Sequence, residues 1–303
     1  MTISSIRIGT RKTQLALKQT ELVVEAIKHH YPSLTIHTIL VDTLGDQIQD
    51  KPLPEIGGKG VFTATLEKAL LAGELDFAVH SLKDLPITPT QGLTNGAVLA
   101  RADVRDVFIS KHKIPLEALP KGARIGTSSP RRKAQLLRYR PDLQIESVRG
   151  SVMTRIQKAL APDGIYDGIV LAMAGISRLE QTDHITEILP LSLMLPAPGQ
   201  GALAVQCRDD AEWREFLAPI YHQQTALETN AERGFLSALG GGCALPIAAH
   251  GEILEQTIRL VGRIIAHDGA QIWEWEVQVP LADSLTSGQR LADELRAKGA
   301  TWA

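Results

Sequence analysis

The stretch from residue 6 to residue 41 reads IRIGTRKTQLALKQTELVVEAIKHHYPSLTIHTILV, and it predicts an α/β fold. It begins with a β-rich run at residues 6–8 and continues in a segment of helical period, residues 15–30, whose apolar side chains share a face. The run Thr35–Val41 is rich in β-branched residues and favours a second strand. A strand, a helix and a strand in this order form the βαβ unit of a parallel sheet.

The alternation of strand and helix patterns continues over the first two thirds of the chain, which predicts parallel sheets there. Proline and glycine break the pattern between residues 190 and 201, and this marks a domain boundary or a crossing segment. We expect further strands at 75–79, 107–109, 123–126, 143–148 and 167–172, and further helices at 62–72, 131–138, 152–160 and 176–179.

The last third of the chain has a different pattern. A helical stretch at 225–239 precedes three strand-like runs, at 247–253, 257–266 and 272–279, and a final helix is expected at 287–298. Successive strands flanked by helices are typical of an α+β domain. We therefore expect a separate small domain at this end.

The composition limits the class of protein. Of the 303 residues 44% are hydrophobic, so the chain can bury substantial cores. We find no signal-peptide pattern and no apolar run of membrane-helix length, and we expect a cytoplasmic protein. With only Cys207 and Cys243, neither a disulfide framework nor a Cys-x-x-Cys motif is possible, and we predict no metal site.

A basic block lies between residues 101 and 160, where fourteen Lys and Arg accompany five Asp and Glu, although the whole chain has 32 against 34. Several of these cations fall where strand patterns pass into helix patterns, and helix N-termini bind anions. Only 4% of the chain is aromatic, which disfavours single-stranded nucleic acid. A phosphate-binding glycine loop is also absent, whereas guanidinium groups pair well with carboxylates. The alternative is a solvated face with ordinary ion pairs.

Two short segments carry further candidates. Lys83 and Asp84 follow the strand expected at 75–79, where open α/β sheets place their sites; the alternative for Asp84 is a turn-capping carboxylate before Pro86. Cys243 follows three glycines that leave its thiol accessible for attachment or nucleophilic chemistry, and the alternative is a buried, inert cysteine. Cys207 lies in an apolar run and is expected to be buried and inert.

Taken together, these segments resemble the porphobilinogen deaminase family, also called the hydroxymethylbilane synthases. The resemblance runs in order from Gly9 to about His250, and the ordered set is specific although each motif alone is weak. The matching motifs are GTRKTQLA at 9–16, GGKG at 57–60, VHSLKDLP at 79–86, GTSS at 126–129 followed by Arg131 and Arg132, VRG at 148–150 with Thr154 and Arg155, Ala174 and Gly175 with Arg178, PGQG at 198–201, AER at 231–233 and GGC at 241–243.

The resemblance implies an α/β fold with three domains. Two α/β domains similar to those of type II periplasmic binding proteins flank a cleft, and a smaller C-terminal α+β domain carries the cofactor loop. In this chain the first domain would comprise residues 1–99 and 200–219, the second 105–195 and the third 222–303.

The resemblance also implies a reaction. Four porphobilinogen molecules are joined head to tail, with loss of ammonia, onto a dipyrromethane cofactor that Cys243 holds by a thioether, and hydroxymethylbilane is released. Asp84 is the implied catalytic residue, because a fixed carboxylate stabilises positive charge and can move protons. The implied cofactor contacts are Ser81, Lys83, Asp84, Thr127, Ser128, Ser129, Arg131, Arg132, Arg149 and Gly150, and the implied substrate contacts are Arg11, Thr13, Gln19, Lys59, Phe62, Arg149, Arg155 and Arg178.

The chain departs from the family pattern at three positions. Thr13 stands where serine is usual and keeps a hydroxyl group. Pro130 replaces a commoner leucine, and proline is favourable at the first position of a helix. Gly240 replaces an acidic residue close to Cys243, which bears on the conformation of that loop.

The expected partner is porphobilinogen alone, bound by a monomer that contacts neither nucleic acid nor a membrane. Two other interpretations remain. A solute-binding protein could capture an anionic small molecule without chemistry, but it would lack its signal peptide and would have no use for Cys243. A nucleic-acid binder is weakened by the scarcity of aromatic residues.

Overall fold

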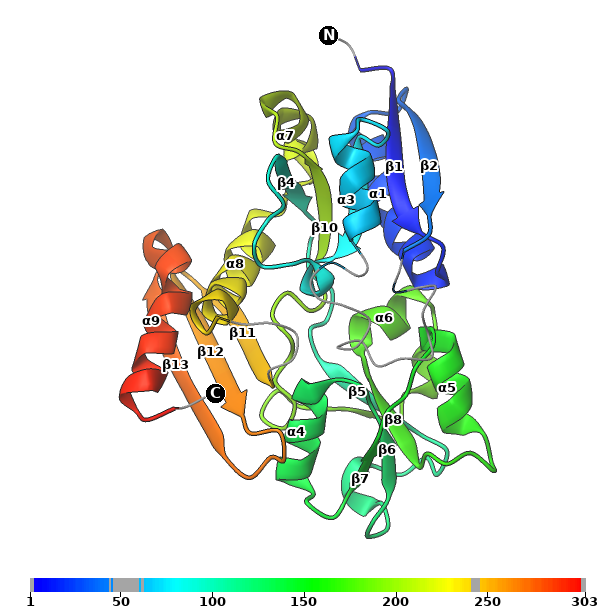
Figure 1. Cartoon of the computed structure of the whole chain (residues 1–303), viewed down its shortest axis with the longest axis vertical. Helices are drawn as coiled ribbons and strands as arrows, with labels where there is room; N and C mark the ends of the chain where they lie inside the picture. The colour runs from blue at the N-terminus through cyan, green and yellow to red at the C-terminus, as the bar shows by residue number, and fades with distance from the viewer. Residues whose placement is uncertain (1–2, 44, 46–59, 61–62, 241–245, 301–303) are drawn as a thin grey trace. The chain divides into compact units, whose positions relative to one another are not determined.

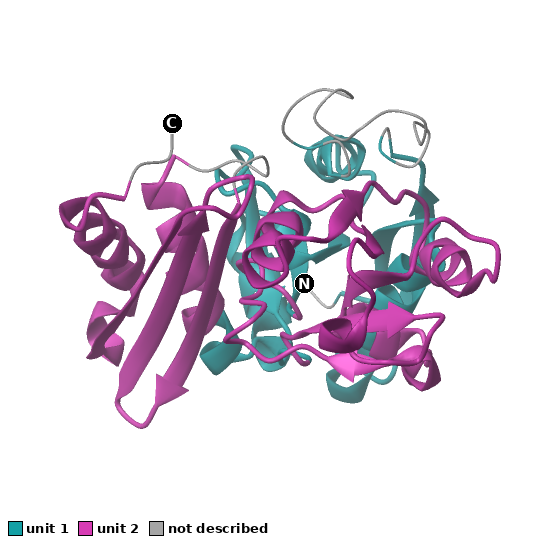
Figure 2. Cartoon of the chain, turned by 90° about the horizontal axis from the view of Figure 1, so that it is seen from below, with its two compact units in different colours: residues 1–102, 202–226 teal, residues 103–201, 227–303 magenta. Residues whose placement is uncertain are grey.

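The computed structural model describes residues 3–43, 45, 60, 63–240 and 246–300. Its chain divides into two compact units, one formed by residues 1–102 and 202–226 and the other by residues 103–201 and 227–303 (Figure 2). The chain therefore passes from one unit to the other near residues 102, 201 and 226. Among the described helices, none has both the length and the apolar character needed to cross a membrane.

Unit 1 contains a five-stranded sheet of order β2-β1-β3-β10-β4 (Figure 1). The central strand pairs are parallel, β1 with β2 and β1 with β3, whereas β10 runs antiparallel to both of its neighbours. The strands are β1 (Ser5–Arg11), β2 (Thr35–Val41), β3 (Phe77–Ser81), β4 (Leu93–Val98) and β10 (Leu203–Arg208).

Helices cover both faces of this sheet, because its strands carry apolar side chains on each side. Val23 and Ile27 of α1 (Gln14–His30) and Phe216 of α7 (Ala211–Leu217) pack in one core. On the other face, Leu66 and Leu70 of α3 (Ala64–Leu71) pack in a second core. Among the described residues, the unit also contains the 3₁₀ turns η2 (Leu82–Asp84) and η5 (Ala218–Ile220).

The first sheet of unit 2 repeats this arrangement with the order β7-β6-β8-β5-β9. Its pairs β6–β7 and β6–β8 are parallel, and β5 is antiparallel to β8 and β9. Helix α4 packs on one face and helices α5 and α6 on the other. The elements are β5 (Asp106–Ser110), η3 (Leu116–Ala118), β6 (Arg124–Gly126), α4 (Pro130–Tyr139), β7 (Gln144–Glu146), α5 (Val152–Leu160), β8 (Gly168–Ala172), α6 (Met173–Arg178), η4 (Thr182–His184) and β9 (Glu187–Ile188).

The two sheets share one topology. In each, three parallel strands that follow one another along the chain stand with the first of them in the middle, β2-β1-β3 in one sheet and β7-β6-β8 in the other, and the next strand in space, β10 or β5, is antiparallel to its neighbours. The predicted α/β fold class is therefore confirmed for these two parts of the chain.

A third sheet lies in the C-terminal part of unit 2 and is wholly antiparallel. Residues of α8 and α9, among them Phe235 and Leu291, bury one face of it in a single core. The elements are α8 (Gln223–Ala238), β11 (Ile247–Leu254), β12 (Thr257–Ile265), β13 (Ile272–Pro280), η6 (Leu281–Asp283) and α9 (Ser284–Ala297). The expected α+β pattern is confirmed, whereas the division of the chain into three domains stays a prediction.

The strands and helices named from the sequence are confirmed to within a few residues at their ends. The expected parallel pairing is confirmed for β1 with β2 and β3 and for β6 with β7 and β8. The two sheets are mixed rather than wholly parallel, because β5 and β10 enter antiparallel. Strands β4, β9 and β10 and helix α7 were not predicted. The GGKG motif at 57–60 lies outside the described residues apart from Gly60.

Candidate functional site

In unit 1, several of the predicted site residues lie at the carboxyl ends of β1 and β3. The two strands are parallel neighbours, with Gly9 beside Ala78, so Arg11 at the end of β1 and Ser81 at the end of β3 come to the same edge of the sheet. This edge is where open α/β sheets bind their ligands.

The start of α1 adds two of the predicted residues to this edge. Thr13 caps the helix, and its hydroxyl accepts a hydrogen bond from the Ala16 amide at 3.3 Å. Gln19, six residues further on in α1, is buried, and its Nε2 donates to the Ser81 hydroxyl at 2.8 Å. The structure therefore brings Gln19 into contact with Ser81, and Thr13 begins the helix that carries Gln19.

The turn that holds Lys83 and Asp84 is anchored on both sides by leucine. Leu82 and Leu85 are buried in a small core, and the Leu82 amide donates to the Ala202 carbonyl at 3.0 Å. The two residues between them consequently face outward: Lys83 is half-buried and Asp84 is exposed. Among the described residues, no ion pair to the Asp84 carboxylate is recorded, so this carboxylate can meet a ligand directly.

In unit 2, the junction between β6 and α4 is held together by three hydroxyl groups. The Thr127 hydroxyl accepts from the Ser129 amide, and the Ser129 hydroxyl caps α4 by accepting from the Arg132 amide. The Ser128 hydroxyl donates to the Val148 carbonyl at 2.9 Å, which ties this junction to the segment after β7. Pro130 occupies the first turn of α4, as its position in the sequence predicted.

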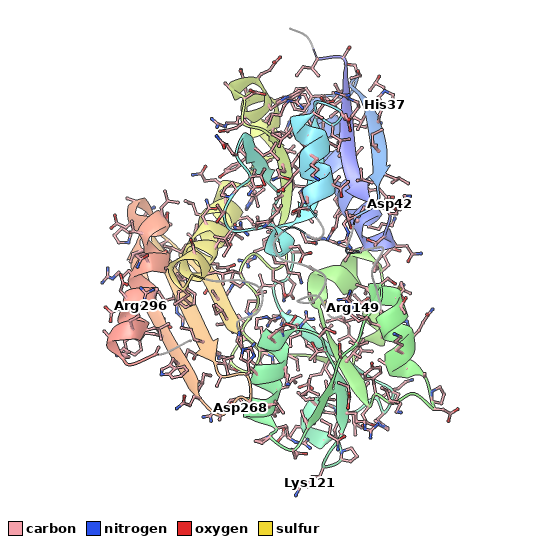
Figure 3. The ribbon with its side chains drawn as sticks, in the orientation of Figure 1. His37, Asp42, Lys121, Arg149, Asp268 and Arg296 are labelled. Atoms are coloured by element: carbon pink, nitrogen blue, oxygen red, sulfur yellow. The ribbon has the colours of Figure 1, made fainter. Side chains whose placement is uncertain are left out.

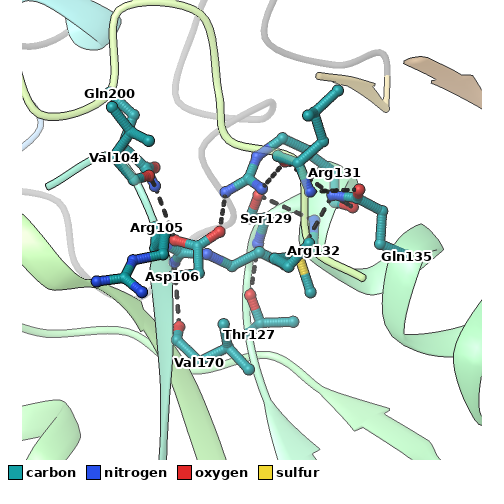
Figure 4. A network of polar contacts seen from close by, with 12 residues as sticks. Val104, Arg105, Asp106, Thr127, Ser129, Arg131, Arg132, Gln135, Val170 and Gln200 are labelled. Atoms are coloured by element: carbon teal, nitrogen blue, oxygen red, sulfur yellow. Dashed lines mark hydrogen bonds and ion pairs between the residues drawn. The ribbon is translucent and has the colours of Figure 1, made fainter. Parts of the chain in front are cut away.

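Arg131 and Arg132 point into the protein, where both guanidinium groups bind Asp106, the first residue of β5 (Figure 4). Arg131 Nη2 lies 2.7 Å from Asp106 Oδ2, and Arg132 Nη2 lies 2.8 Å from Asp106 Oδ1. Burial alone raises the pKa of the Asp106 carboxyl, but the two guanidinium groups outweigh it and hold the pKa well below its usual range. Asp106 is therefore an anion, and two buried cations share it.

A second basic segment follows β7 and leads into α5. Arg149, labelled in Figure 3, and Gly150 form this segment, and Gly150 has a φ of 115°, which favours glycine. The Gly150 carbonyl accepts a hydrogen bond from Arg155 Nε at 2.9 Å. Because β7 is parallel to β6, these residues lie at the same sheet edge as Thr127 to Arg132.

Arg178 is the last residue of α6, the helix that follows β8. Its Nη2 donates to the Gly201 carbonyl at 2.7 Å. Burial lowers the pKa of Arg178 to about 10, which leaves the side chain cationic at neutral pH.

The geometry of unit 2 suits a ligand that carries several carboxylates. Arg131 and Arg132 together carry two positive charges against the single charge of Asp106. Arg132 Nε is buried and has no hydrogen-bond partner among the described residues. A buried donor without a partner and an uncompensated charge both favour an anion at this place.

Three predicted site residues, Lys59, Phe62 and Cys243, lie outside the described residues. Conversely, sequence reasoning missed Asp106 and assigned no role to Gln200, which binds Asp106. A signal for Asp106 was available, because an acid opens an otherwise apolar strand, Asp-Val-Phe-Ile-Ser, and buried acids need a cationic partner.

Comparison with known proteins agrees with this geometry. Residues 6–215 match the family model described as porphobilinogen deaminase, dipyromethane cofactor binding domain, and residues 226–297 match the C-terminal domain of porphobilinogen deaminase. The porphobilinogen deaminase of Syntrophotalea carbinolica is 44% identical over 99% of this chain and 95% of its own length. That of Trichlorobacter lovleyi is 45% identical over 97% of this chain and 94% of its own length.

Solved structures of binding proteins are more distantly similar. The methionine binding protein MetQ covers 74% of this chain and 93% of its own, with a TM-score of 0.45 and 14% sequence identity. The periplasmic aliphatic sulphonate binding protein SsuA from Escherichia coli covers 78% of this chain and 70% of its own, with a TM-score of 0.41 and 14% identity.

Proposed function

The chain belongs to the porphobilinogen deaminase family, and we propose that it joins four porphobilinogen molecules head to tail, with release of ammonia, and releases hydroxymethylbilane. The reaction makes it a transferase of tetrapyrrole and haem biosynthesis. The observation that carries the proposal is the match to the family's cofactor-binding domain over residues 6–215, which contain every predicted site residue except Cys243.

The matching domain of this family binds a dipyrromethane cofactor, and we propose that this cofactor is the primer whose terminal pyrrole carbon joins the first substrate unit. We propose that Cys243 attaches it by a thioether. The acid side chains of such a primer need cations and hydrogen-bond donors around them. Those that we assign are Ser81, Lys83, Thr127, Ser128, Ser129, Arg131, Arg132, Arg149 and Gly150, and the uncompensated charge beside Asp106 supports the assignment.

Asp84 is the proposed catalytic residue. Loss of ammonia leaves an electron-poor substrate on which positive charge develops, and a carboxylate fixed nearby stabilises that charge. Its anchoring between the buried leucines Leu82 and Leu85 supports this role, because a preorganised group need not reorient during the reaction. The same carboxylate can also take up and return protons.

The incoming porphobilinogen also carries carboxylates, and we assign its binding to a second set of residues. Gln19 and Thr13 are held by α1 beside Arg11, at the sheet edge that carries Ser81. Arg155 and Arg178 belong to unit 2. The full proposed set is Arg11, Thr13, Gln19, Lys59, Phe62, Arg149, Arg155 and Arg178.

The remaining expectations concern the whole protein. We propose three domains, of residues 1–99 with 200–219, 105–195 and 222–303, because the third sheet has a core of its own. We also propose a cytoplasmic monomer that binds no nucleic acid, the last because only 4% of the chain is aromatic.

The reaction can be tested with the purified chain and porphobilinogen as the only substrate. We expect four ammonia molecules for each linear tetrapyrrole, measured by an ammonia assay and by mass spectrometry of the product. Binding of porphobilinogen without release of ammonia would instead identify a solute-binding protein.

A further inference from the structure

Asp106 lies at the centre of a hydrogen-bond network that includes two of the proposed site residues, Arg131 and Arg132. It is fully buried, and its carboxylate accepts hydrogen bonds from Arg131, Arg132 and Gln200 at 2.7, 2.8 and 2.9 Å (Figure 4). Three donors around one buried carboxylate fix both of its oxygens.

The two arginines are held at their other nitrogens as well. Arg131 Nη1 donates to the Leu195 carbonyl at 2.6 Å, and Arg132 Nη1 donates to the Val170 carbonyl at 3.1 Å. Each guanidinium group is thus bound on two sides, by a carbonyl and by Asp106, and its plane is set. Arg132 Nε is left without a partner among the described residues, as the donor available for an anion.

Gln200 links this carboxylate to the segments through which the chain changes units. The side chain is buried, and its Nε2 donates to Asp106 Oδ1 and, at 2.7 Å, to the Val104 carbonyl. Val104 follows the first passage between units, near residue 102, and Gln200 precedes the second, near residue 201. One amide therefore ties both passages to the carboxylate that holds the arginines.

We propose that Asp106 is a positioning residue that orients the guanidinium groups of Arg131 and Arg132 toward the cofactor's carboxylates. Through Gln200, the orientation of the two arginines also depends on the crossing segments, the stretches near residues 102 and 201 where the chain passes between units. The inference rests on the proposed function. The Asp106 carboxylate also neutralises one of the two positive charges of Arg131 and Arg132. The three side chains together therefore present a single net positive charge to the growing pyrrole chain, which the enzyme must bind and then release as each unit is added.

The test uses the cofactor-bearing enzyme, a limited supply of porphobilinogen and intact mass spectrometry of the enzyme–intermediate complexes. Asp106→Asn removes the charge, and Gln200→Met removes the amide that binds both Asp106 and the Val104 carbonyl but keeps every charge. We expect both variants to accumulate complexes with one or two added units at least threefold over the wild type, and the KM for porphobilinogen to change less than twofold.

Asp142→Asn is the matched control, since Asp142 pairs with Arg140 just beyond the other end of α4. It should leave the distribution of complexes unchanged. If Asp106 only stabilised the fold, its replacement would lower the fraction of folded enzyme. The relative amounts of the enzyme–intermediate complexes formed by the folded fraction would then stay the same. If Asp106→Asn does not fold, Gln200→Met, which keeps every charge, decides the question alone.

An unchanged distribution in folded Asp106→Asn and in Gln200→Met overturns the inference while leaving the proposed function intact. A wild-type enzyme that carries no dipyrromethane and releases no ammonia overturns the proposed function, and this inference with it.

Discussion

At the scale of single residues, two aspartates differ in their environment, and we assign them different roles for that reason. Asp106 is fully buried and bound by two arginines, whereas Asp84 is exposed on a turn between two buried leucines. A carboxylate saturated by guanidinium groups can orient them but has no capacity left for a substrate. The exposed carboxylate is the one that can meet the reacting atoms.

Replacing Asp84 by asparagine should lower turnover at least about 100-fold, the usual contribution of a group that transfers protons or stabilises charge in the transition state. The free energy of unfolding should change by less than about 0.5 kcal/mol, because Asp84 is exposed. The measurements are the rate of ammonia release and denaturant unfolding. Asp163→Asn, at another exposed aspartate, is the control and should retain full activity.

His80 should make the stability of unit 1 depend on pH. Burial, together with the charge of Arg11, lowers its pKa from 6.5 to about 4, against the opposing effect of Gln206. The folded protein thus favours the neutral ring, so this contribution is complete above pH 6.5 and is lost as the pH falls to 4. The loss amounts to about 3 kcal/mol.

This loss can be measured as the free energy of unfolding at several pH values in the wild type and in His80→Asn. The variant should lose less stability between pH 6.5 and pH 4. Parallel curves for the two proteins would show that His80 does not titrate differently in the folded and unfolded states.

At the scale of elements, α4 makes polar contacts with two different strands, β5 and β12. Its first turn carries Arg131 and Arg132, while Gln135, one turn later, accepts a hydrogen bond from Arg263 of β12 at 2.6 Å. Arg263 also donates to the Ser192 carbonyl at 2.9 Å. The third sheet is therefore attached to the helix that holds the arginine pair.

Arg263→Met should lower the free energy of unfolding by roughly 2–4 kcal/mol, since several hydrogen bonds of a buried cation are lost and its partner groups lose a donor. Arg259→Met provides a control on the same strand, because the Arg259–Glu276 pair is exposed and should contribute less than about 1 kcal/mol. Denaturant unfolding measures both. Equal effects would contradict the structural role of Arg263.

Helices α8 and α9 meet at two glycines that differ in the space around them. A Cβ atom on Gly288 would lie 2.2 Å from the Phe235 amide nitrogen, whereas one on Gly234 would meet nothing closer than 3.8 Å. Gly288→Ala should therefore cost more than about 2 kcal/mol of unfolding free energy, because backbone must move. Gly234→Ala should be neutral or stabilise by up to about 1 kcal/mol through helix propensity. A tolerated Gly288→Ala would contradict this close helix packing.

The sequence predicted those elements whose pattern is local. Thr35–Val41 is β-branched along its length, and α5 has an apolar face of helical period; both have the predicted bounds. Strand β4 was missed because it reads LTNGAV, with Asn95 and Gly96 in its middle. Gly96 is needed there for packing, since a Cβ would lie 2.5 Å from Leu217, a neighbour that only the tertiary structure reveals. The antiparallel entry of β10 likewise depends on pairing with distant strands.

At the scale of the whole molecule, the same topology occurs twice, and each sheet carries proposed site residues at the carboxyl ends of its parallel strands. The sequence predicted most of these residues, because the turns after parallel strands carry recognisable polar motifs. It did not identify the partners of Asp106 and Gln200, because these partners lie 25 or more residues away along the chain.

The central claim is that this chain builds hydroxymethylbilane on a dipyrromethane attached to Cys243, and intact mass spectrometry tests it most directly. The purified wild type should be heavier than its 303 residues by one dipyrromethane, and Cys243→Ser should have the unmodified mass and no turnover. A wild-type chain of unmodified mass that still converts porphobilinogen into the linear tetrapyrrole would contradict the account.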